Sequence, residues 1–111
     1  MSPEAIAFNI QPEELKQRID RGEKIILVDV RQPDEHQVCR LPNDTLIPLM
    51  ELPQRAGELK PEDEIVLYCH TGNRSSTAVY YLRQMGFTKA RNLVGGVEAW
   101  ATRIDPTMAR Y

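Results

Sequence analysis

Residues 65–76 read Ile-Val-Leu-Tyr-Cys-His-Thr-Gly-Asn-Arg-Ser-Ser, an apolar run that delivers Cys69 to a short polar loop. The run is typical of a buried strand, and a helical pattern over Arg74–Met85 follows the loop. The amides of such a loop and the helix N-terminus favour negative charge, so they lower the pKa of a thiol and increase its thiolate fraction. The sequence therefore predicts a reactive sulfur held among anion-binding amides.

Strand-like and helix-like stretches alternate along the whole chain. The strand candidates are Ile6–Ile10, Ile25–Val30, Thr45–Leu49, Ile65–Cys69 and Ala90–Val94. The helix candidates are Gln11–Ile19, Pro33–Val38, Leu52–Leu59, Arg74–Met85 and a segment after Gly95-Gly96 that carries Val97 and Trp100. This alternation predicts βαβ units in an α/β fold, with a central five-stranded, mostly parallel sheet flanked by helices on both faces.

Two polar sequences follow the two most apolar strand candidates. Cys69 ends one of these strands, and Asp29-Val30-Arg31 ends the other. Ligands of open parallel sheets bind beyond the carboxyl ends of the strands. Both features therefore predict a functional site at the same edge of the sheet.

Length and composition exclude several classes of protein. A chain of 111 residues predicts one domain over 1–111, and a net charge of −2 gives no basic field for nucleic acid. No apolar run reaches the roughly 18 residues of a membrane span, and Met1–Ala5 lacks a signal pattern, so we expect a cytoplasmic protein that does not bind membranes. Two cysteines and two histidines without metal-ligand spacing argue against a disulfide scaffold, a metal or another cofactor. A monomer is the default expectation.

Four motifs occur in order between about Ile10 and Trp100. They are Val28-Asp29-Val30-Arg31 followed by Pro33 and Glu35, then Ile47-Pro48-Leu49, then Cys69-x-x-Gly72-x-Arg74-Ser75, and finally Leu93-Val94-Gly95-Gly96-Val97-x-x-Trp100. Together they resemble the signatures of the rhodanese family of sulfurtransferases. The resemblance implies a rhodanese-like fold and a sulfurtransferase activity.

Two further segments resemble a narrower group. Val38-Cys39-Arg40-Leu41-Pro42 and the ending Ala99–Pro106, closing with Tyr111, are similar to the C-terminal rhodanese domain of adenylyltransferase–sulfurtransferase proteins. Those proteins serve molybdopterin and thiolated-tRNA synthesis and pass sulfur to a small ubiquitin-like carrier. This chain shows no Gly-rich nucleotide loop and no zinc cysteines, so we expect a free-standing relative or an excised domain.

The resemblance implies a role for each residue of the loop. Cys69 would carry a sulfane sulfur as a persulfide, and the surrounding amides would stabilise negative charge on it. Gly72 would let the loop curl, Arg74 would close it against a carboxylate or a carbonyl, and Ser75 could cap the following helix. The implied substrate-binding residues are His70, Thr71, Gly72, Asn73, Arg74 and Ser75.

The residues give less information on the sulfur donor and the sulfur acceptor. Arg74 is the only permanent cation of the loop, whereas thiosulfate is a dianion. We therefore expect weak activity with thiosulfate and favour a persulfide-bearing protein, such as a cysteine desulfurase, as the donor. The acceptor stays open among cyanide, thioredoxin-like thiols and a small sulfur-carrier protein.

Two other functions compete with the sulfurtransferase. One is a non-catalytic rhodanese-fold module that only docks a partner, against which the presence of Cys69, Gly72 and Arg74 argues. The other is a dual-specificity phosphatase. In those enzymes five residues separate the cysteine from the arginine, whereas four separate Cys69 from Arg74, which favours sulfur over phosphate.

Several residues also have a plain structural interpretation. Cys39 is by default a packing residue, with a resolving thiol as the alternative. Asp29 is expected to support the loop indirectly through hydrogen bonds, and Arg31 is either a surface charge or a group at the mouth of the site. His70 is expected to contribute mainly its amide, and His36 to be solvated. We expect the tail after Asp105-Pro106 to be only loosely held.

Overall fold

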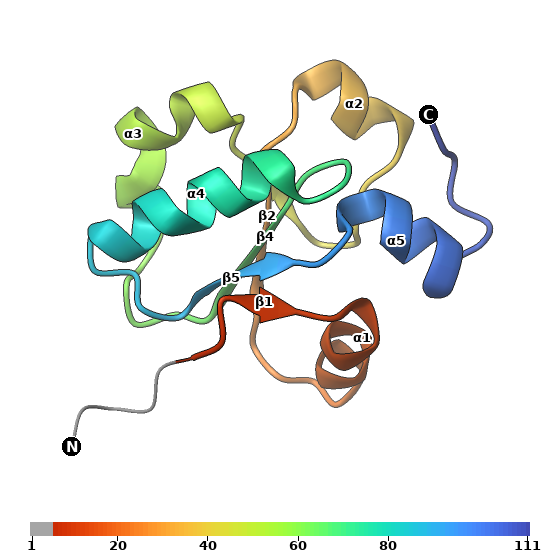
Figure 1. The fold of residues 1–111 in the computed structure, drawn as a ribbon, viewed down its shortest axis with the longest axis horizontal. Coiled ribbons are helices and arrows are strands. Elements are labelled where there is room, and N and C mark those ends of the chain that lie inside the picture. Colours follow the sequence, from red (N-terminus) through yellow and green to blue (C-terminus); the bar gives the residue numbers. More distant parts are fainter. Residues whose placement is uncertain (1–5) are drawn as a thin grey trace.

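A computed structural model describes residues 6–111 of the chain (Figure 1). Residues 1–5, on which the absence of a signal pattern was judged, lie outside the described residues. In chain order the elements are β1 (Asn9–Ile10), α1 (Pro12–Asp20), β2 (Ile26–Asp29), α2 (Pro33–Val38), β3 (Thr45–Leu46), the 3-10 helix η1 (Leu49–Glu51), α3 (Leu52–Arg55), the 3-10 helix η2 (Ala56–Glu58), β4 (Ile65–Tyr68), α4 (Asn73–Gln84), β5 (Ala90–Leu93) and α5 (Gly96–Arg103).

The five strands form one sheet in the order β1-β5-β4-β2-β3, and every neighbouring pair is parallel. In the register of the two central strands, Ile26 lies opposite Ile65 and Asp29 opposite Tyr68. β2 and β4 therefore end level with each other, which brings the residues after them to one edge. The predicted α/β fold with a parallel five-stranded sheet is confirmed.

Alternation along β4 divides the core between the two faces of the sheet. Ile65, Leu67 and Cys69 belong to a cluster with apolar residues of α3 and α4. Val66 and Tyr68 belong to a second cluster with apolar residues of α1 and α5. Helices thus cover both faces, with α4 on one side and α1 on the other (Figure 1). The strands are buried on both faces, which explains their continuous apolar sequence.

The structure shortens two of the expected elements. The expected strand Thr45–Leu49 is only Thr45–Leu46 in the structure: the amides of Ile47 and Leu49 still donate to the carbonyls of Asp29 and Val30, but Pro48 lacks an amide to continue the strand. The expected helix Leu52–Leu59 becomes α3 between two 3-10 turns, because Pro53 fits only the first turn of a helix and Gly57 weakens its continuation.

The expectation of a loosely held tail is wrong. The chain after α5 returns toward α2 (Figure 1), where Tyr111 contacts three side chains of the carboxyl edge. Arg110 forms an ion pair with Glu98 of α5. Side-chain contacts therefore fix a segment whose sequence alone shows no periodic pattern.

Among helices of residues 6–111, none has the length and apolar character needed to cross a membrane.

Candidate functional site

Cys69 follows β4 directly and begins the loop that leads into α4. This loop lies at the carboxyl edge of the sheet, next to the N-terminal end of α5 (Figure 1). The cysteine is 1% exposed. Its position at the end of a central parallel strand is the position in which α/β folds bind ligands.

Hydrogen-bond donors of the loop surround the Cys69 sulfur. The amide of Gly72 donates to Sγ over 3.1 Å, and the amide and the hydroxyl of Ser75 both donate over 3.4 Å. The Ser75 hydroxyl has a single proton, which it can direct either to the sulfur or to Oδ1 of Asn92 at 2.5 Å. The sulfur thus sits in a cradle of donors that favours a negative charge.

This cradle lowers the pKa of the Cys69 thiol. Burial by itself opposes ionisation, but hydrogen bonds from the Ser75 hydroxyl and from the amides of Ser75, Gly72 and Thr71 outweigh it and hold the pKa below its ordinary value. The N-terminus of the 12-residue helix α4 faces the same sulfur and acts in the same direction. A larger fraction of thiolate at neutral pH follows, and the thiolate is the nucleophilic form.

Gly72 gives the loop its curvature. Its φ is +113°, a conformation that side chains other than that of glycine rarely adopt. Gly72 is also the residue before α4, so helix α4 begins at Asn73 and Ser75 lies inside its first turn. Ser75 is therefore not the helix cap that was expected; it faces the sulfur instead.

Helix α5 holds the loop from the other side. The amides of Val97 and Glu98, in the first turn of α5, donate to the carbonyls of Cys69 and His70 over 2.9 and 3.0 Å. A Cβ atom at Gly96 would lie 2.4 Å from the Cys69 carbonyl oxygen. Only glycine lets α5 approach the loop this closely.

Arg74 closes the loop by pairing with Glu35 of α2. Its two terminal nitrogens donate to the two carboxylate oxygens of Glu35 over 2.8 and 2.9 Å. This pairing, together with the Gln32 amide and the Tyr111 hydroxyl, outweighs partial burial and lowers the pKa of Glu35 to about 2. The carboxylate was one of two partners that the sequence left open for Arg74, and Glu35 itself lies in the Pro-x-Glu motif.

Asp29 and Arg31 form a buried ion pair below the mouth of the loop. Both side chains are 0% exposed, and the guanidinium donates to both oxygens of Asp29 and to the Cys39 carbonyl. The interpretation of Arg31 as a surface charge is therefore wrong. So is that of His36 as solvated, because its Nδ1 lies 2.9 Å from Asp29 and its side chain is 19% exposed.

The remaining loop residues differ in their surroundings. Thr71 and Asn73 are exposed, and the Thr71 amide contributes to the cradle. His70 is half-buried, because its ring stacks on Tyr111 with 4.1 Å between centroids and 15° between planes. We expected His70 to contribute mainly its amide, whereas its side chain also stacks on Tyr111.

The two cysteines are free and face different sides of the sheet. Cys39 packs with Leu41 and Tyr68 in the α1/α5 cluster, whereas Cys69 belongs to the α3/α4 cluster. Cys39 Sγ also lies 3.8 Å from a terminal nitrogen of Arg31. This placement favours the packing interpretation of Cys39 over a resolving thiol.

Asp29, His36 and Asp44 place three potential metal-ligating atoms within 4.8 Å of one another. Arg31 already pairs with Asp29, and the Tyr68 hydroxyl donates to Asp44 over 2.5 Å. The negative charge of this cluster is therefore largely compensated by the chain itself, and its donor set does not favour a cation.

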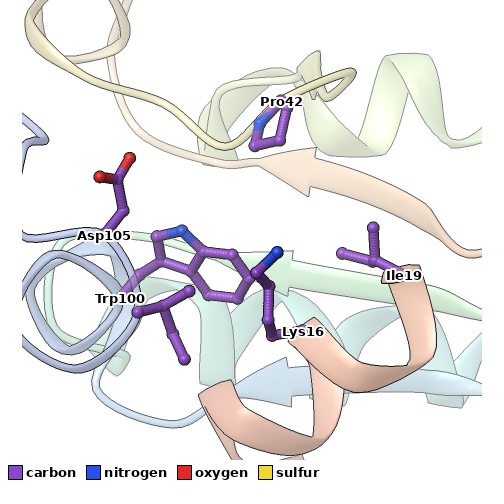
Figure 2. Close-up of a pocket in the computed structure, with 6 residues that line it drawn as sticks. Lys16, Ile19, Pro42, Trp100 and Asp105 are labelled. Atoms are coloured by element: carbon purple, nitrogen blue, oxygen red, sulfur yellow. The ribbon is translucent and has the colours of Figure 1, made fainter. Parts of the chain in front are cut away.

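A pocket of about 290 Å³ lies apart from the loop of Cys69. Figure 2 shows the ring of Trp100 between Asp105 and Lys16 of α1, with Pro42 across the open space from them. The lining residues are Lys16, Ile19, Pro42, Trp100, Ile104 and Asp105. Trp100 is 4% exposed, so it serves both as a core residue and as the wall of this groove.

Sequence reasoning missed Asn92 and Tyr111. Asn92 has a local signal, because asparagine is rare inside a buried strand such as β5. Tyr111 has no local signal, because its partners His70, Glu35 and Arg31 lie 41, 76 and 80 positions away in the sequence.

Several proteins that are named as sulfurtransferases are similar to this chain. A "Sulfurtransferase" of Allochromatium vinosum is 37% identical over 100 residues, which cover 90% of this chain and 94% of that protein. "Adenylyltransferase and sulfurtransferase MOCS3" of Arabidopsis thaliana is 31% identical over 118 residues, covering 92% of this chain but only 25% of that protein. The human single-domain sulfurtransferase TSTD1 has a TM-score of 0.80 at 28% identity, over 88% of this chain and 98% of that one.

Other curated relatives are longer than the matched region. The chain spans 52% of YrkF of Bacillus subtilis (strain 168), whose name describes it provisionally as a sulfur carrier and which is 36% identical over 96 residues, 86% of this chain. The model of the rhodanese-like domain matches residues 11–103. The chain therefore belongs to the rhodanese family, with relatives among adenylyltransferase–sulfurtransferases as well as single-domain sulfurtransferases.

Proposed function

We propose that this protein is a sulfurtransferase that carries a sulfane sulfur as a persulfide on Cys69 and passes it to a nucleophilic acceptor. The observation that carries the proposal is the cradle around Sγ, in which two amides and one hydroxyl donate to a nearly buried sulfur. The same donors that stabilise the thiolate would stabilise a negative outer sulfur that replaces it in the loop.

The reaction divides into two displacements at sulfur. The Cys69 thiolate attacks the sulfane sulfur of the donor; a new S–S bond forms, the S–S bond of the donor breaks, and sulfite or the donor thiolate leaves. In the second step an acceptor thiolate or cyanide attacks the outer sulfur. The S–S bond to Cys69 breaks, the Cys69 thiolate is regenerated, and an acceptor persulfide or thiocyanate leaves.

The charge distribution at the mouth favours a protein persulfide over thiosulfate as the donor. Arg74 is the only permanent cation of the loop, and Glu35 compensates its charge through two hydrogen bonds. A dianion such as thiosulfate therefore meets little net positive charge, whereas a persulfide on a donor protein brings only one negative charge. The carrier-protein acceptor is proposed on the resemblance to adenylyltransferase–sulfurtransferases.

Two rival functions are less compatible with the geometry. A docking module needs no hydrogen-bond donors directed at a buried thiol, and a phosphatase needs a loop wide enough for a tetrahedral anion. Here Gly72 and Ser75 already approach the sulfur to 3.1 and 3.4 Å.

Intact-mass spectrometry tests the proposal. Incubation with a persulfide donor is expected to add the mass of one sulfur atom, and the addition should disappear in Cys69→Ala but persist in Cys39→Ser. If no donor adds sulfur, or if Cys69→Ala gains it as wild type does, the proposal is wrong. Hydrolysis of a phosphotyrosine substrate without any sulfur adduct would support the phosphatase instead.

The donor preference is tested separately by kinetics. We expect the second-order rate constant of loading from a cysteine desulfurase persulfide to exceed that from thiosulfate at equal pH and ionic strength. Glu35→Gln removes the negative charge that compensates Arg74, so the loop should attract the thiosulfate dianion more strongly. The difference between the two rate constants should therefore be smaller in this variant. High turnover with a low KM in a thiosulfate:cyanide assay would contradict the preference.

A further inference from the structure

Tyr111 contacts the loop of Cys69 near both of its ends. Its ring stacks on His70, the residue after Cys69, with 4.1 Å between ring centroids. Its hydroxyl donates to Oε2 of Glu35 over 2.8 Å. Both carboxylate oxygens of Glu35 accept hydrogen bonds from Arg74, the residue that closes the loop. One side chain thus touches the beginning of the loop directly and its end through a single carboxylate.

The same hydroxyl joins the two ion pairs of the site. It accepts a hydrogen bond from Nη1 of Arg31 over 2.9 Å while donating to Glu35. Arg31 is held by Asp29, and Glu35 holds Arg74. Among residues 6–111, no other direct hydrogen bond joins the Asp29–Arg31 pair to the Glu35–Arg74 pair. The hydroxyl is therefore the bridge between the base of the site and its mouth.

The tail is built to bring Tyr111 to this place. Arg110 pairs with Glu98 of α5, whose amide in turn donates to the His70 carbonyl. Met108 packs against the apolar cluster of α1 and α5, and the Met108 amide donates to the Asp105 carbonyl over 3.1 Å. Tyr111 itself stays 45% exposed. A residue whose purpose was core stability would be more deeply buried, whereas the contacts of Tyr111 are with residues of the site.

We propose that Tyr111 is a positioning residue of the Cys69 site, whose ring fixes His70 and whose hydroxyl fixes the Glu35–Arg74 pair so that the sulfur-binding loop is ordered before a donor arrives. This proposal rests on the assignment of Cys69 as the reacting sulfur. A loop that is ordered in the folded protein loses no further conformational entropy when the donor binds and reacts. Its hydrogen-bond donors are then already in place around the sulfur.

The pH profile of Cys69 alkylation by iodoacetamide is the test, because it reports the cradle without requiring any sulfur transfer. The charged and titratable groups near the loop and Tyr111 include Arg74 of α4, Glu35 of α2, Glu98 of α5, His70, Asp29, Arg31 and Arg110. At a pH below the thiol pKa, we expect Cys69 of Tyr111→Ala to be alkylated about tenfold more slowly than Cys69 of wild type. In Tyr111→Phe, which retains the ring, the alkylation rate should fall about threefold. At high pH, where the thiol is fully ionised, the rates should converge.

Tyr80 supplies the matched control. It lies on α4 and is 64% exposed. Within residues 6–111, its side chain forms no hydrogen bond or ring stacking with the loop. Tyr80→Ala should leave the profile unchanged. An unchanged profile in Tyr111→Ala, or an equal change in Tyr80→Ala, overturns the proposal, and a Tyr111→Phe profile identical to that of wild type overturns the role of the hydroxyl.

Sulfur loading separates this proposal from the proposed function. If wild-type protein gains no sulfur from any donor while the alkylation profile depends on Tyr111 as expected, the sulfurtransferase assignment fails and the positioning role stands. If wild type gains sulfur, and if Cys69 of the Tyr111 variants is alkylated and loaded with sulfur as fast as in wild type, only the positioning role fails.

Discussion

At the scale of single residues, the donors around Cys69 decide how reactive its sulfur is. Burial of a thiol raises its pKa, and the chain offsets this with hydrogen bonds from Ser75, Gly72 and Thr71. Ser75 contributes its amide and also its hydroxyl, whose single proton Cys69 Sγ shares with Oδ1 of Asn92 at 2.5 Å. The side chain of Ser75 is therefore the part of the cradle that mutation can remove without altering the backbone.

Ser75→Ala tests the contribution of this hydroxyl. Loss of one hydrogen bond to a charged sulfur should raise the pKa of Cys69 and slow its alkylation about tenfold at a pH below that pKa. Stopped-flow alkylation across pH measures the change. Thr77→Ala, an exposed position on the same helix, serves as control, and equal profiles for Ser75→Ala and wild type would contradict the role of the hydroxyl.

At the scale of elements, β4, α4 and α5 build the loop together. β4 delivers Cys69, α4 turns its N-terminus toward the sulfur, and α5 donates two amides to the loop carbonyls. Gly96 is the position at which this arrangement is tightest, because a Cβ there would meet the Cys69 and His70 carbonyls at 2.4 and 2.6 Å.

Gly96→Ala is expected to destabilise the protein and to displace the loop. The positive φ of +59° and the backbone contact together should cost roughly 2–4 kcal/mol of unfolding free energy. Urea denaturation followed by circular dichroism measures this value. The matched variant Gly57→Ala, where nothing lies within 4 Å, should change it by less than about 0.5 kcal/mol, and an equal effect of the two would contradict the explanation.

The elements that the sequence predicts well are those fixed by local pattern. The strands Ile26–Asp29 and Ile65–Tyr68 and the helix Asn73–Gln84 follow from continuous apolar runs and from helical periodicity. The division of Leu52–Leu59 into the short helix α3 and the 3-10 turn η2 depended on where Pro53 fell relative to a helix start, which the weak pattern there did not determine. The Leu93–Trp100 motif indicated the turn into α5 but not its contact with the Cys69 carbonyl.

At the scale of the whole molecule, side chains from distant segments meet at the carboxyl edge of the sheet. Glu35 of α2 reaches Arg74 of α4 across 39 positions of sequence, and Tyr111 reaches Glu35 across 76. Sequence periodicity carries no information on such contacts. The family resemblance implied a carboxylate or carbonyl partner for Arg74, but the burial of Arg31 and the anchoring of the tail emerge only when the chain is folded.

The Glu35–Arg74 pair makes stability depend on pH. The pKa of Glu35 is about 2 in the folded protein, against an ordinary value of 4.5, so its contribution is fully present above pH 4.5 and is lost as the pH falls toward 2. The contribution is at most about 3 kcal/mol. Urea denaturation should show Glu35→Gln to be less stable than wild type at pH 7, with a smaller difference at pH 3.

The control for this dependence is Glu62→Gln, at an exposed position between β3 and β4. Its stability should follow that of wild type at both pH values. A constant difference between Glu35→Gln and wild type from pH 7 to pH 3 would show that the ion pair does not account for it.

A single-turnover transfer tests the persulfide assignment most directly. The protein is loaded with sulfur, freed of the donor and mixed with a small thiol acceptor, and the intact masses of protein and acceptor are followed in time. The account predicts that Cys69 loses one sulfur atom at the rate at which the acceptor gains one, in wild type and Cys39→Ser alike, and that Cys69→Ala never carries sulfur. Sulfur that stays on the protein, or that leaves from a residue other than Cys69, would contradict it.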